Sequence, residues 1–321
     1  MNIDLDAELR KVFSEIDLIA ADNRSGAAEI IARAAAVFST LESSCPAIQP
    51  LDAETARRLA LRTCVALSRA QPDMAPLARL ASAVAEQVNA SGTGRDVIAR
   101  AAASARDFIE LSTRATACAA TVAASLLRNG ATILTHSRSS TVLTALLEAR
   151  SAGLRFSVIA TESRPGLEGR SLSAELARNG MEVSLVADAA AGLMMAESDM
   201  VLLGADRVTP DSVVNKIGTR MIALAARENG LPVYALADTT KFINSIVVPE
   251  DVRDERSAGE IWPDPPRGVR VVNRYFEPTP LDHFTGIVTE EGILLPRDAG
   301  ERAKSTSLDQ VLIKALRNEN E

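Results

Sequence analysis

Residues 130–161 read GATILTHSRSSTVLTALLEARSAGLRFSVIAT, and this stretch decides the fold. Short apolar runs at 131–135 and 156–160 flank a segment with helical character at 140–151. Short, continuously apolar strands that alternate with helices are typical of a parallel sheet covered on both faces. Consecutive units of this kind predict an α/β domain with a Rossmann-like, doubly wound parallel sheet.

The same alternation continues toward the C-terminus. Further apolar runs of strand length lie at 183–186, 200–203 and 233–236. Predicted helices separate them at 170–179, 189–197 and 216–229. Two later segments, 269–272 and 285–289, are expected to extend the sheet, and 308–316 is expected to form a final helix.

Upstream of residue 130 the sequence has helical periodicity. Apolar residues recur at helical spacing, as at Leu9, Val12 and Ile16, and alanine, the best helix former, is abundant. Polar, Gly or Pro breaks fall at 23–26, 44–46, 71–73 and 91–94. We therefore predict two domains: a helical N-terminal domain at 1–128 and a Rossmann-like domain at 129–321.

Composition narrows the class of function. The 321 residues carry 35 Lys and Arg against 42 Asp and Glu, a formal net charge of −7. This balance argues against a protein that binds nucleic acid through a globally basic surface. Aromatic residues make up only 3%, which disfavours stacking platforms for single-stranded nucleic acid. We expect no direct nucleic-acid partner.

Cysteine and histidine usage points to a reducing compartment and away from a metal site. Cys45, Cys64 and Cys118 form no C-x-x-C pair, a usage typical of buried thiols in a cytoplasmic protein. His136 and His283 are too few for a histidine-rich metal site. No signal peptide and no apolar run of about 18 residues is present, so we expect a cytoplasmic protein without a membrane partner.

Polar residues follow every predicted strand of the C-terminal domain. Ligands of open α/β sheets bind at the carboxyl ends of the strands, so these residues are the candidate site. The segments that follow the five strands are THSRSST at 135–141, TESRPGLEGR at 161–170, Asp188, GADR at 204–207 and DTTKF at 238–242. The segment VNKIGT at 214–219 is expected to open a helix.

The residue types at these strand ends suit an anionic ligand. Ser139 and Ser140 fall at a predicted helix N-terminus, where free backbone N–H groups favour phosphate. Arg164, with Arg170 as a secondary candidate, offers forked donors to phosphate oxygens, and Asn215 and Lys216 add a polar group and a cation. No G-x-G-x-x-G or P-loop sequence is present, which disfavours a dinucleotide cofactor or an NTPase.

Each residue also has a purely structural interpretation. Ser139 and Ser140 are suitable helix caps, and Arg164 and Arg170 are suitable surface charges. Asp206 suits a turn. Their joint position at five strand ends favours the functional interpretation.

Four motifs in order resemble a known family. They are ILTHSRSSTVL at 133–143, TESRPGLEGR at 161–170, GADRVTPDSVVNKIGT at 204–219 and YFEPTPLD at 275–282. They look like the translation initiation factor 2B α/β/δ subunit family, which also contains the methylthioribose-1-phosphate and ribose-1,5-bisphosphate isomerases. The resemblance covers nearly the whole chain, since 23–29 and 72–77 are also similar to the family.

The resemblance implies a phosphosugar or nucleoside-phosphate pocket between the domains and a homodimer formed through the C-terminal domain. It implies that an Asp after the fourth strand acts on the sugar in the isomerases, and this residue is Asp206 here. It also implies a Cys after the first strand, but that position holds Ser137. A serine hydroxyl is far less acidic than a thiol, whose pKa lies near 8.5, and needs a partner base.

Three hypotheses follow. The first is a phosphosugar- or nucleoside-phosphate-binding protein of the initiation-factor-like branch, regulatory or of unassigned activity, acting as a homodimer or with related subunits. Ser139, Ser140, Arg164, Asn215 and Lys216 would hold the phosphate, and Asp206 the sugar hydroxyls. The alternative is an aldose–ketose sugar-phosphate isomerase that uses Asp206, with Ser137 or a water in place of the thiol, and needs no cofactor. The third, a structural scaffold, is disfavoured by the polar strand ends.

Overall fold

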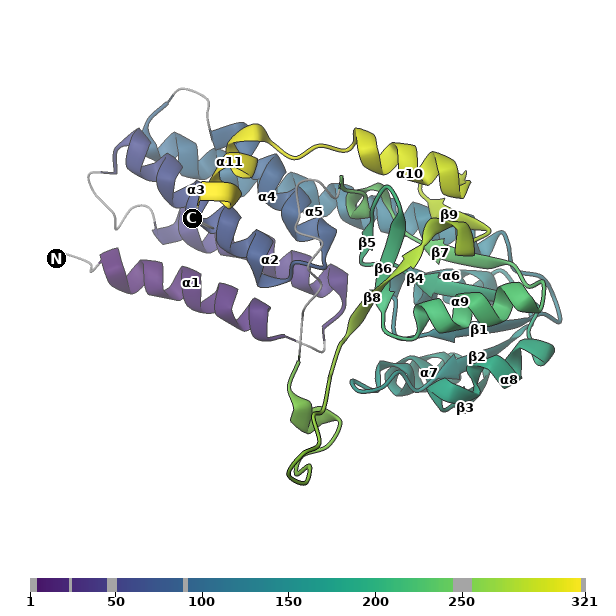
Figure 1. The fold of residues 1–321 in the computed structure, drawn as a ribbon. Coiled ribbons are helices and arrows are strands. Elements are labelled where there is room, and N and C mark those ends of the chain that lie inside the picture. The colour runs from purple at the N-terminus through teal and green to yellow at the C-terminus, as the bar shows by residue number, and fades with distance from the viewer. Residues whose placement is uncertain (1–4, 23–24, 45–50, 89–91, 245–255, 319–321) are drawn as a thin grey trace. The chain divides into compact units, whose positions relative to one another are not determined.

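The computed structural model describes residues 5–22, 25–44, 51–88, 92–244 and 256–318. The chain forms two compact units, which Figure 1 colours along the sequence. The first comprises Met1–Arg114 and Thr306–Glu321, and the second comprises Ala115–Ser305. Among the described residues, no helix combines the length and the apolar character that crossing a membrane requires.

The first unit is helical, as the periodicity predicts. Its helices are α1 (Leu5–Ala21), α2 (Ala27–Ser44), α3 (Ala53–Ala70), α4 (Ala75–Val88), most of α5 (Gly94–Ala124) and α11 (Gln310–Asn318). The helices pack closely because small side chains such as Ala34, Ala60 and Ala81 are fully buried between them. The predicted break at 71–73 separates α3 from α4, and α1 ends before the break predicted at 23–26 while α2 begins after it. Residues 23 and 24, Cys45 and parts of the other two breaks lie outside the described residues. The final helix α11 packs on α3 and α4.

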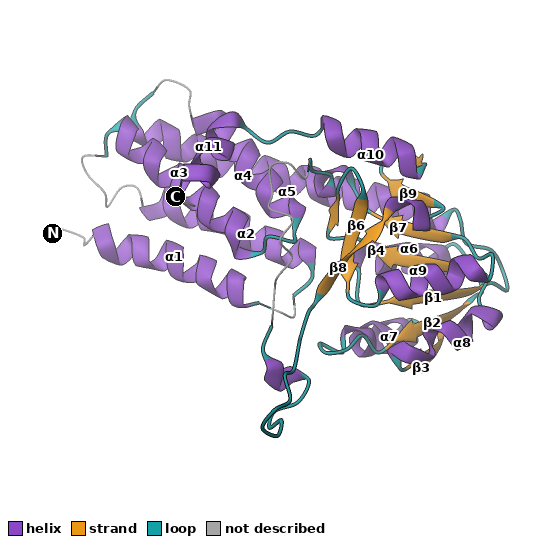
Figure 2. Ribbon diagram, in the orientation of Figure 1, coloured by secondary structure: helices purple, strands orange, loops and turns teal. Residues whose placement is uncertain are grey.

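The second unit is built on a seven-stranded sheet, shown in orange in Figure 2. Its strands are β1 (Thr132–His136), β2 (Ser157–Thr161), β3 (Glu182–Val186), β4 (Met200–Gly204), β7 (Val233–Leu236), β9 (Gly286–Thr289) and β10 (Gly292–Leu294). The order is β10-β9-β7-β4-β1-β2-β3, and only β10 is antiparallel to its neighbour. The predicted parallel sheet is therefore confirmed.

Helices cover both faces of this sheet because successive strand residues point to opposite sides. Ile133, Val158 and Leu202 pack under the end of α5, α6 (Ser140–Ser151) and α7 (Glu168–Arg178). Leu134, Ile159 and Val201 pack against α8 (Ala191–Met194), α9 (Thr219–Glu228) and α10 (Pro296–Ser305). A doubly wound sheet with two apolar layers results.

A second sheet was not predicted. Strands β5 (Arg207–Val208), β6 (Ser212–Lys216) and β8 (Phe276–Pro280) form a three-stranded antiparallel sheet. The helix predicted from residue 216 begins only at Thr219, because residues 212–216 pair with β8 and Gly218 adopts a φ of 105°.

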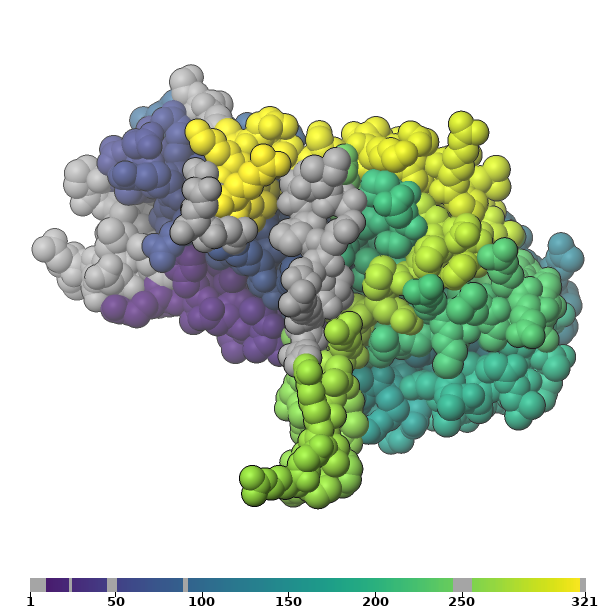
Figure 3. Space-filling view, viewed as in Figure 1, coloured from purple at the N-terminus to yellow at the C-terminus, as the bar shows by residue number. Residues whose placement is uncertain are grey.

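The strand predicted at 269–272 is wrong. Val269 and Val272 are 46% and 48% exposed and lie in an arm, residues 257–272, that projects from the second unit (Figures 1 and 3). In the described structure no strand lies beside this segment, so its backbone has no partner for strand hydrogen bonds. Its exposed side chains also bury little apolar surface. The strand predicted at 285–289 is confirmed as β9, and the final helix predicted at 308–316 corresponds to α11.

Gly169 allows α7 to approach β2, and its replacement tests this packing. A Cβ at residue 169 would lie 1.7 Å from the backbone oxygen of Thr161, so Gly169→Ala forces the helix away from the strand. We expect a loss of about 1–3 kcal/mol in unfolding free energy, measured by urea denaturation. Gly192→Ala is the matched control: nothing lies within 4 Å of its added Cβ, and its stability should not fall. Equal stability of the two variants would contradict the packing argument.

Candidate functional site

The predicted strand ends meet at one edge of the large sheet because β1, β2 and β4 run parallel and in register (Figure 2). Thr135 lies beside Ala160 and Leu202, and His136 lies beside Leu203. The loops that leave these strands therefore start within one strand spacing of each other, about 4.8 Å. We call this the carboxyl edge.

His136 joins three segments of the carboxyl edge. Its Nε2 lies 2.8 Å from the carbonyl oxygen of Ile217 and its Nδ1 lies 2.6 Å from Oγ1 of Thr161. A carbonyl only accepts, so Nε2 carries the proton and Nδ1 accepts from the Thr161 hydroxyl. Burial lowers the pKa of His136, which keeps the ring neutral, although the hydrogen bond to Ile217 opposes this shift.

The loop after β2 is fixed from both sides. Ser163 accepts a hydrogen bond from the backbone N–H of Ser137 (2.7 Å) through its Oγ. The Asp188 carboxylate accepts the backbone N–H groups of Ser163 and Arg164, each at 2.7 Å. Ser137 and Ser163 both adopt a left-handed φ, at 65° and 64°, so these bonds hold conformations that L-residues seldom take.

Ser139 and Asn215 come together around Gly204. Ser139 is the N-cap of α6 and accepts the N–H of Val142 at 3.3 Å. A Cβ at Gly204 would lie 2.7 Å from the Cβ of Ser139 and 3.6 Å from Oδ1 of Asn215. The glycine thus allows the N-terminus of α6 to sit against the end of β4. Asn215 itself donates to Thr219 Oγ1 at 2.9 Å.

Lys216 lies in a separate buried cluster. Its ammonium is 2.6 Å from Oε1 of Glu168 and 4.3 Å from the ring centre of Tyr275, and its side chain is only 4% exposed. Because Asn215 and Lys216 are neighbours on strand β6, their side chains point to opposite faces. Burial and a hydrogen bond to Glu260 raise the pKa of the Tyr275 phenol, which stays protonated.

The two predicted arginines, Arg164 and Arg170, lie at the solvent-exposed border of the carboxyl edge. Arg164 is exposed, and its guanidinium has a long 3.5 Å contact to the carbonyl of Glu260. Arg170 is 58% exposed and pairs with Glu162 at 2.9 Å, so its charge already has a counter-ion. Arg170 is therefore not brought to the cluster formed by Lys216.

The remaining predicted residues follow their strands directly. Ser140 begins α6 and is half-buried. Ser137, also half-buried, lies between β1 and α6, and its hydroxyl has no hydrogen bond within the described part of the chain. Asp206 lies between β4 and β5, is half-buried, and donates its backbone N–H to Val214 O at 2.9 Å, which extends the pairing of β5 with β6 by one residue.

Two buried polar atoms at the carboxyl edge lack partners. Oγ1 of Thr141, in the first turn of α6, and Oε2 of Glu168 have no hydrogen bond although both atoms are inaccessible. Buried polar groups are nearly always satisfied, so such atoms call for an explanation. Each can accept a hydrogen bond from a hydroxyl that a ligand brings within reach, and the Thr141 hydroxyl can also donate one.

Several contributors escaped the sequence argument. Glu168, Thr161, Ser163 and Asp188 lie in the strand-end segments, yet nothing in the sequence shows which of them pair with His136 or Lys216. Tyr275 lies within the family-like segment at 275–282, and only the fold brings it to Lys216. Among the described residues, no group of three or more His, Cys, Asp or Glu side chains could hold a metal ion.

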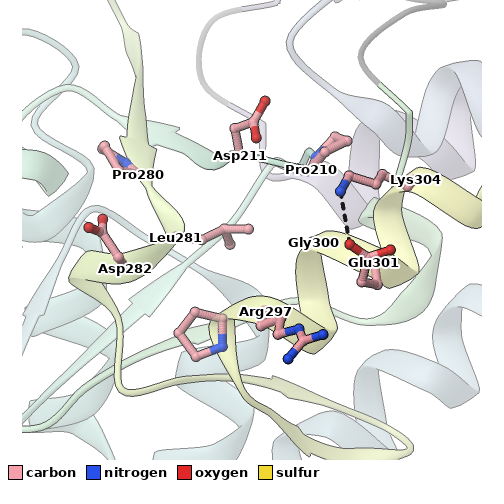
Figure 4. Close-up of a pocket in the computed structure, with 10 residues that line it drawn as sticks. Pro210, Asp211, Pro280, Leu281, Asp282, Arg297, Gly300, Glu301 and Lys304 are labelled. Carbon is pink, nitrogen blue, oxygen red and sulfur yellow. Dashed lines mark hydrogen bonds and ion pairs between the residues drawn. The ribbon is translucent and has the colours of Figure 1, made fainter.

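A separate hollow of about 470 Å³ lies between the β5–β6 turn, the end of β8 and α10 (Figure 4). Asp211, Leu281 and Arg297 line it, together with the ion pair between Glu301 and Lys304. None of the predicted site residues lines this hollow.

Comparison with known proteins identifies the family. Residues 24–296 match the Initiation factor 2 subunit family. The chain belongs to this family. A crystal structure of the translation initiation factor eIF-2B of Pyrococcus horikoshii OT3 has the same fold, with a TM-score of 0.76 and 33% identity, covering 89% of this chain and 97% of that one. The recognition and the fold class predicted from the sequence are thus confirmed.

Members of the family carry more than one kind of name. An eIF-2B subunit 2-like protein of Pyrococcus horikoshii is 41% identical over 179 residues, which are 55% of this chain and 62% of that protein. A ribose 1,5-bisphosphate isomerase of Archaeoglobus fulgidus is 38% identical over 199 residues, 61% of this chain and 64% of the isomerase. Each match spans less than two thirds of the relative's length. The family therefore includes both initiation-factor-like proteins and sugar-phosphate isomerases.

The neutral state of His136 predicts a pH dependence. In the unfolded chain a histidine takes up a proton as the pH falls below about 6.5, whereas folded His136 has a lowered pKa and resists protonation. Its contribution to stability is therefore complete above pH ~6.5 and is lost as the pH falls from there toward the folded pKa. In an NMR titration we expect the His136 Cε1–H signal to remain at its neutral position at pH 6.5.

The assignment needs one variant, because His283 is the only other histidine. His283→Asn leaves a single imidazole signal. Half-protonation of His136 at pH 6.5 or above would contradict the burial and the Nε2–H tautomer described here.

Proposed function

We propose that the carboxyl edge binds a phosphorylated sugar or nucleoside and that the protein is a ligand-sensing or regulatory member of its family. The observation that carries this proposal is the pair of buried, unpartnered atoms, Thr141 Oγ1 and Glu168 Oε2, at two places along the same edge. A ligand with hydroxyl and phosphate oxygens satisfies both kinds of atom.

The phosphate would be held at the N-terminus of α6. The first N–H groups of a helix have no acceptor within the helix, and the dipole favours an anion there. Ser139 and Ser140 add hydroxyls to these amides. Asn215 stands beside Ser139 across Gly204, Arg164 extends from the solvent-exposed border, and Asp206 follows the same strand as Gly204. In this arrangement Asp206 binds sugar hydroxyls.

Lys216 supplies the buried cation. In the structure its counter-ion is Glu168, which occupies one donor of the ammonium at 2.6 Å. An ammonium has three donors, so a further oxygen of the same ligand can join on this face of β6 without breaking the pair. Glu168 also limits the net positive charge of the cluster, which favours a monoester over a polyphosphate.

The regulatory role is favoured by what surrounds Ser137. Both ring nitrogens of the adjacent His136 are engaged, by Thr161 and by Ile217, so His136 has no free nitrogen to activate the Ser137 hydroxyl. Without a base, a serine is a poor substitute for a reactive thiol.

The alternative is an aldose–ketose sugar-phosphate isomerase, and Glu168 is the observation that favours it. Isomerisation moves protons between neighbouring sugar atoms, which is work for general acids and bases. Asp206 would be the first such group, with Ser137 in the place of the missing thiol. Glu168, with its free buried oxygen, supplies a second carboxylate for the same proton transfers.

We also propose that the protein forms a homodimer through its C-terminal domain, alone or together with related subunits. Light scattering of the purified chain should then give twice the 34.0 kDa of the monomer. A mass of one chain at micromolar concentration would contradict the homodimer.

Ligand binding tests the main proposal. We expect ribose 1,5-bisphosphate, methylthioribose 1-phosphate or a nucleoside monophosphate to raise the melting temperature. At a concentration one hundred times the Kd the gain is about 2.7 kcal/mol, or roughly 5–10 °C for a unit of this size. The double variant Lys216→Met/Glu168→Gln removes the ion pair without leaving a buried charge, and it should weaken binding by about tenfold or more.

Arg227→Gln, an exposed change on α9, is the control and should bind like the parent chain. No shift with any phosphate ester would overturn the proposal and favour the scaffold.

Turnover separates the two functions. If the protein is an isomerase, Asp206→Asn should abolish conversion of the sugar phosphate, because the amide can neither give nor take the proton. Product formation by NMR measures this directly. If the parent chain binds a phosphate ester but converts none, and Asp206→Asn still binds, the regulatory role holds and the isomerase is excluded.

A further inference from the structure

A second hollow lies at the opposite end of the strands. It occupies about 380 Å³ beside the starts of β1, β2 and β3, and its lining includes Gly130, Ser157 and Glu182. These strands are five residues long, so the hollow lies about 17 Å from the carboxyl edge. We call it the amino-edge hollow. None of the residues predicted to bind phosphate lines it.

Two arginines without counter-ions share this hollow. Arg150 comes from the last turn of α6 and Arg155 from the loop before β2. Within the described ranges, neither guanidinium forms a hydrogen bond or an ion pair. Other arginines of the second unit, such as Arg138 and Arg170, pair with carboxylates at 2.9 Å. Two guanidinium groups that share one hollow and have no carboxylate partner within the described ranges form a positive site that an anion can enter.

The backbone around the hollow is fixed and leaves room. The N–H of Gly130 donates to the carbonyl of Arg155 at 2.7 Å, and the N–H of Arg155 donates to Asn129 Oδ1 at 2.8 Å. Gly130 and Gly180 have positive φ, at 79° and 72°. A Cβ at Gly180 would lie 3.8 Å from Nη2 of Arg150, so the missing side chain keeps the approach to this guanidinium open.

The lining selects a class of ligand. A guanidinium can donate two parallel hydrogen bonds to two phosphate oxygens. The two positive charges of a pair of guanidinium groups balance the two negative charges of a phosphate monoester. The exposed Glu182 carboxylate repels a bare anion but accepts hydrogen bonds from hydroxyls. A hollow of about 380 Å³ is also larger than a phosphate ion and falls in the range of small-molecule sites.

We propose that the amino-edge hollow is a second binding site, for a phosphate monoester that carries free hydroxyls. Arg150 and Arg155 hold the phosphate, and Glu182 accepts a sugar hydroxyl. Pentose phosphates and nucleoside monophosphates share this chemistry. The site is independent of the carboxyl edge, and a ligand bound there contacts the starts of the same strands whose ends form the first site.

Calorimetric titration of the full chain tests this inference. The probes are ribose 5-phosphate, uridine 5′-monophosphate and inorganic phosphate. The background is Lys216→Met/Glu168→Gln, in which binding at the carboxyl edge is weakened. We expect one equivalent of an ester to bind more tightly than inorganic phosphate, and Arg150→Gln/Arg155→Gln to weaken that binding by about tenfold or more. The tighter of the two esters identifies the source of the ligand.

A matched control removes the same charge elsewhere. Arg227→Gln/Arg297→Gln changes two exposed arginines on α9 and α10 and should bind like its background. Hydrogen exchange of the unmodified chain gives a second readout that needs no variant: the ester should protect amides at 128–132, 150–157 and 178–182.

Three results would overturn the inference: no binding of any probe, equal affinity in the Arg150/Arg155 variant and the control, or protection confined to the carboxyl edge. The last result would leave the proposed function standing while removing the second site. Conversely, protection of the unmodified chain at 150–157 without protection at the carboxyl edge would contradict the proposed function and leave the second site standing.

Discussion

The neutral imidazole of His136 is the interaction on which the carboxyl edge depends. One ring nitrogen donates to the carbonyl of Ile217 and the other accepts from Thr161, so a single side chain connects β1, β2 and the turn before α9. The arrangement requires an uncharged ring with one donor and one acceptor, and burial provides it by lowering the pKa. Gly218 fits against the ring because a Cβ there would lie 3.1 Å from Nε2.

Around this centre the polar groups divide into two sets with different physical roles. His136, Thr161, Ser163 and Asp188 satisfy one another and hold the backbone of the loops. Thr141 and Glu168 each retain a buried atom without a partner. A self-satisfied network gives rigidity, whereas unsatisfied groups carry a cost that a ligand can relieve. The hydrogen-bonded residues around His136 therefore hold Thr141 and Glu168, the two residues with unpartnered atoms, in fixed positions.

The sequence predicts the parts of this fold whose apolar pattern is strong. The runs at 131–135, 156–160 and 233–236 correspond to β1, β2 and β7 within one residue, and the helix at 140–151 matches α6. The small sheet was missed for physical reasons. Strand β5 has two residues, and β8 contains Pro278 and Pro280, which cannot donate to a ladder and argue against a strand. Without β8 as partner, residues 212–216 show no strand signal.

Because ligands of open α/β sheets bind at the carboxyl ends of the strands, the sequence predicts one edge for the candidate residues. It does not show which of their side chains form pairs. Lys216 and Glu168 are 48 positions apart and meet only because α7 and β6 are folded into the same unit. Residue alternation on β6 separates Asn215 from Lys216, and this alternation applies only once the segment is known to be a strand.

The packing of Lys216 against Tyr275 has an optical consequence. The chain holds only two tyrosines and one tryptophan, so its near-ultraviolet spectrum comes from very few chromophores. One of them lies 4.3 Å from the ammonium of Lys216 and 5.3 Å from the guanidinium of Arg256. Its transition energies therefore follow the electric field of these two cations, so a ligand that altered the surroundings of Lys216 would change the circular dichroism near 280 nm without any attached label.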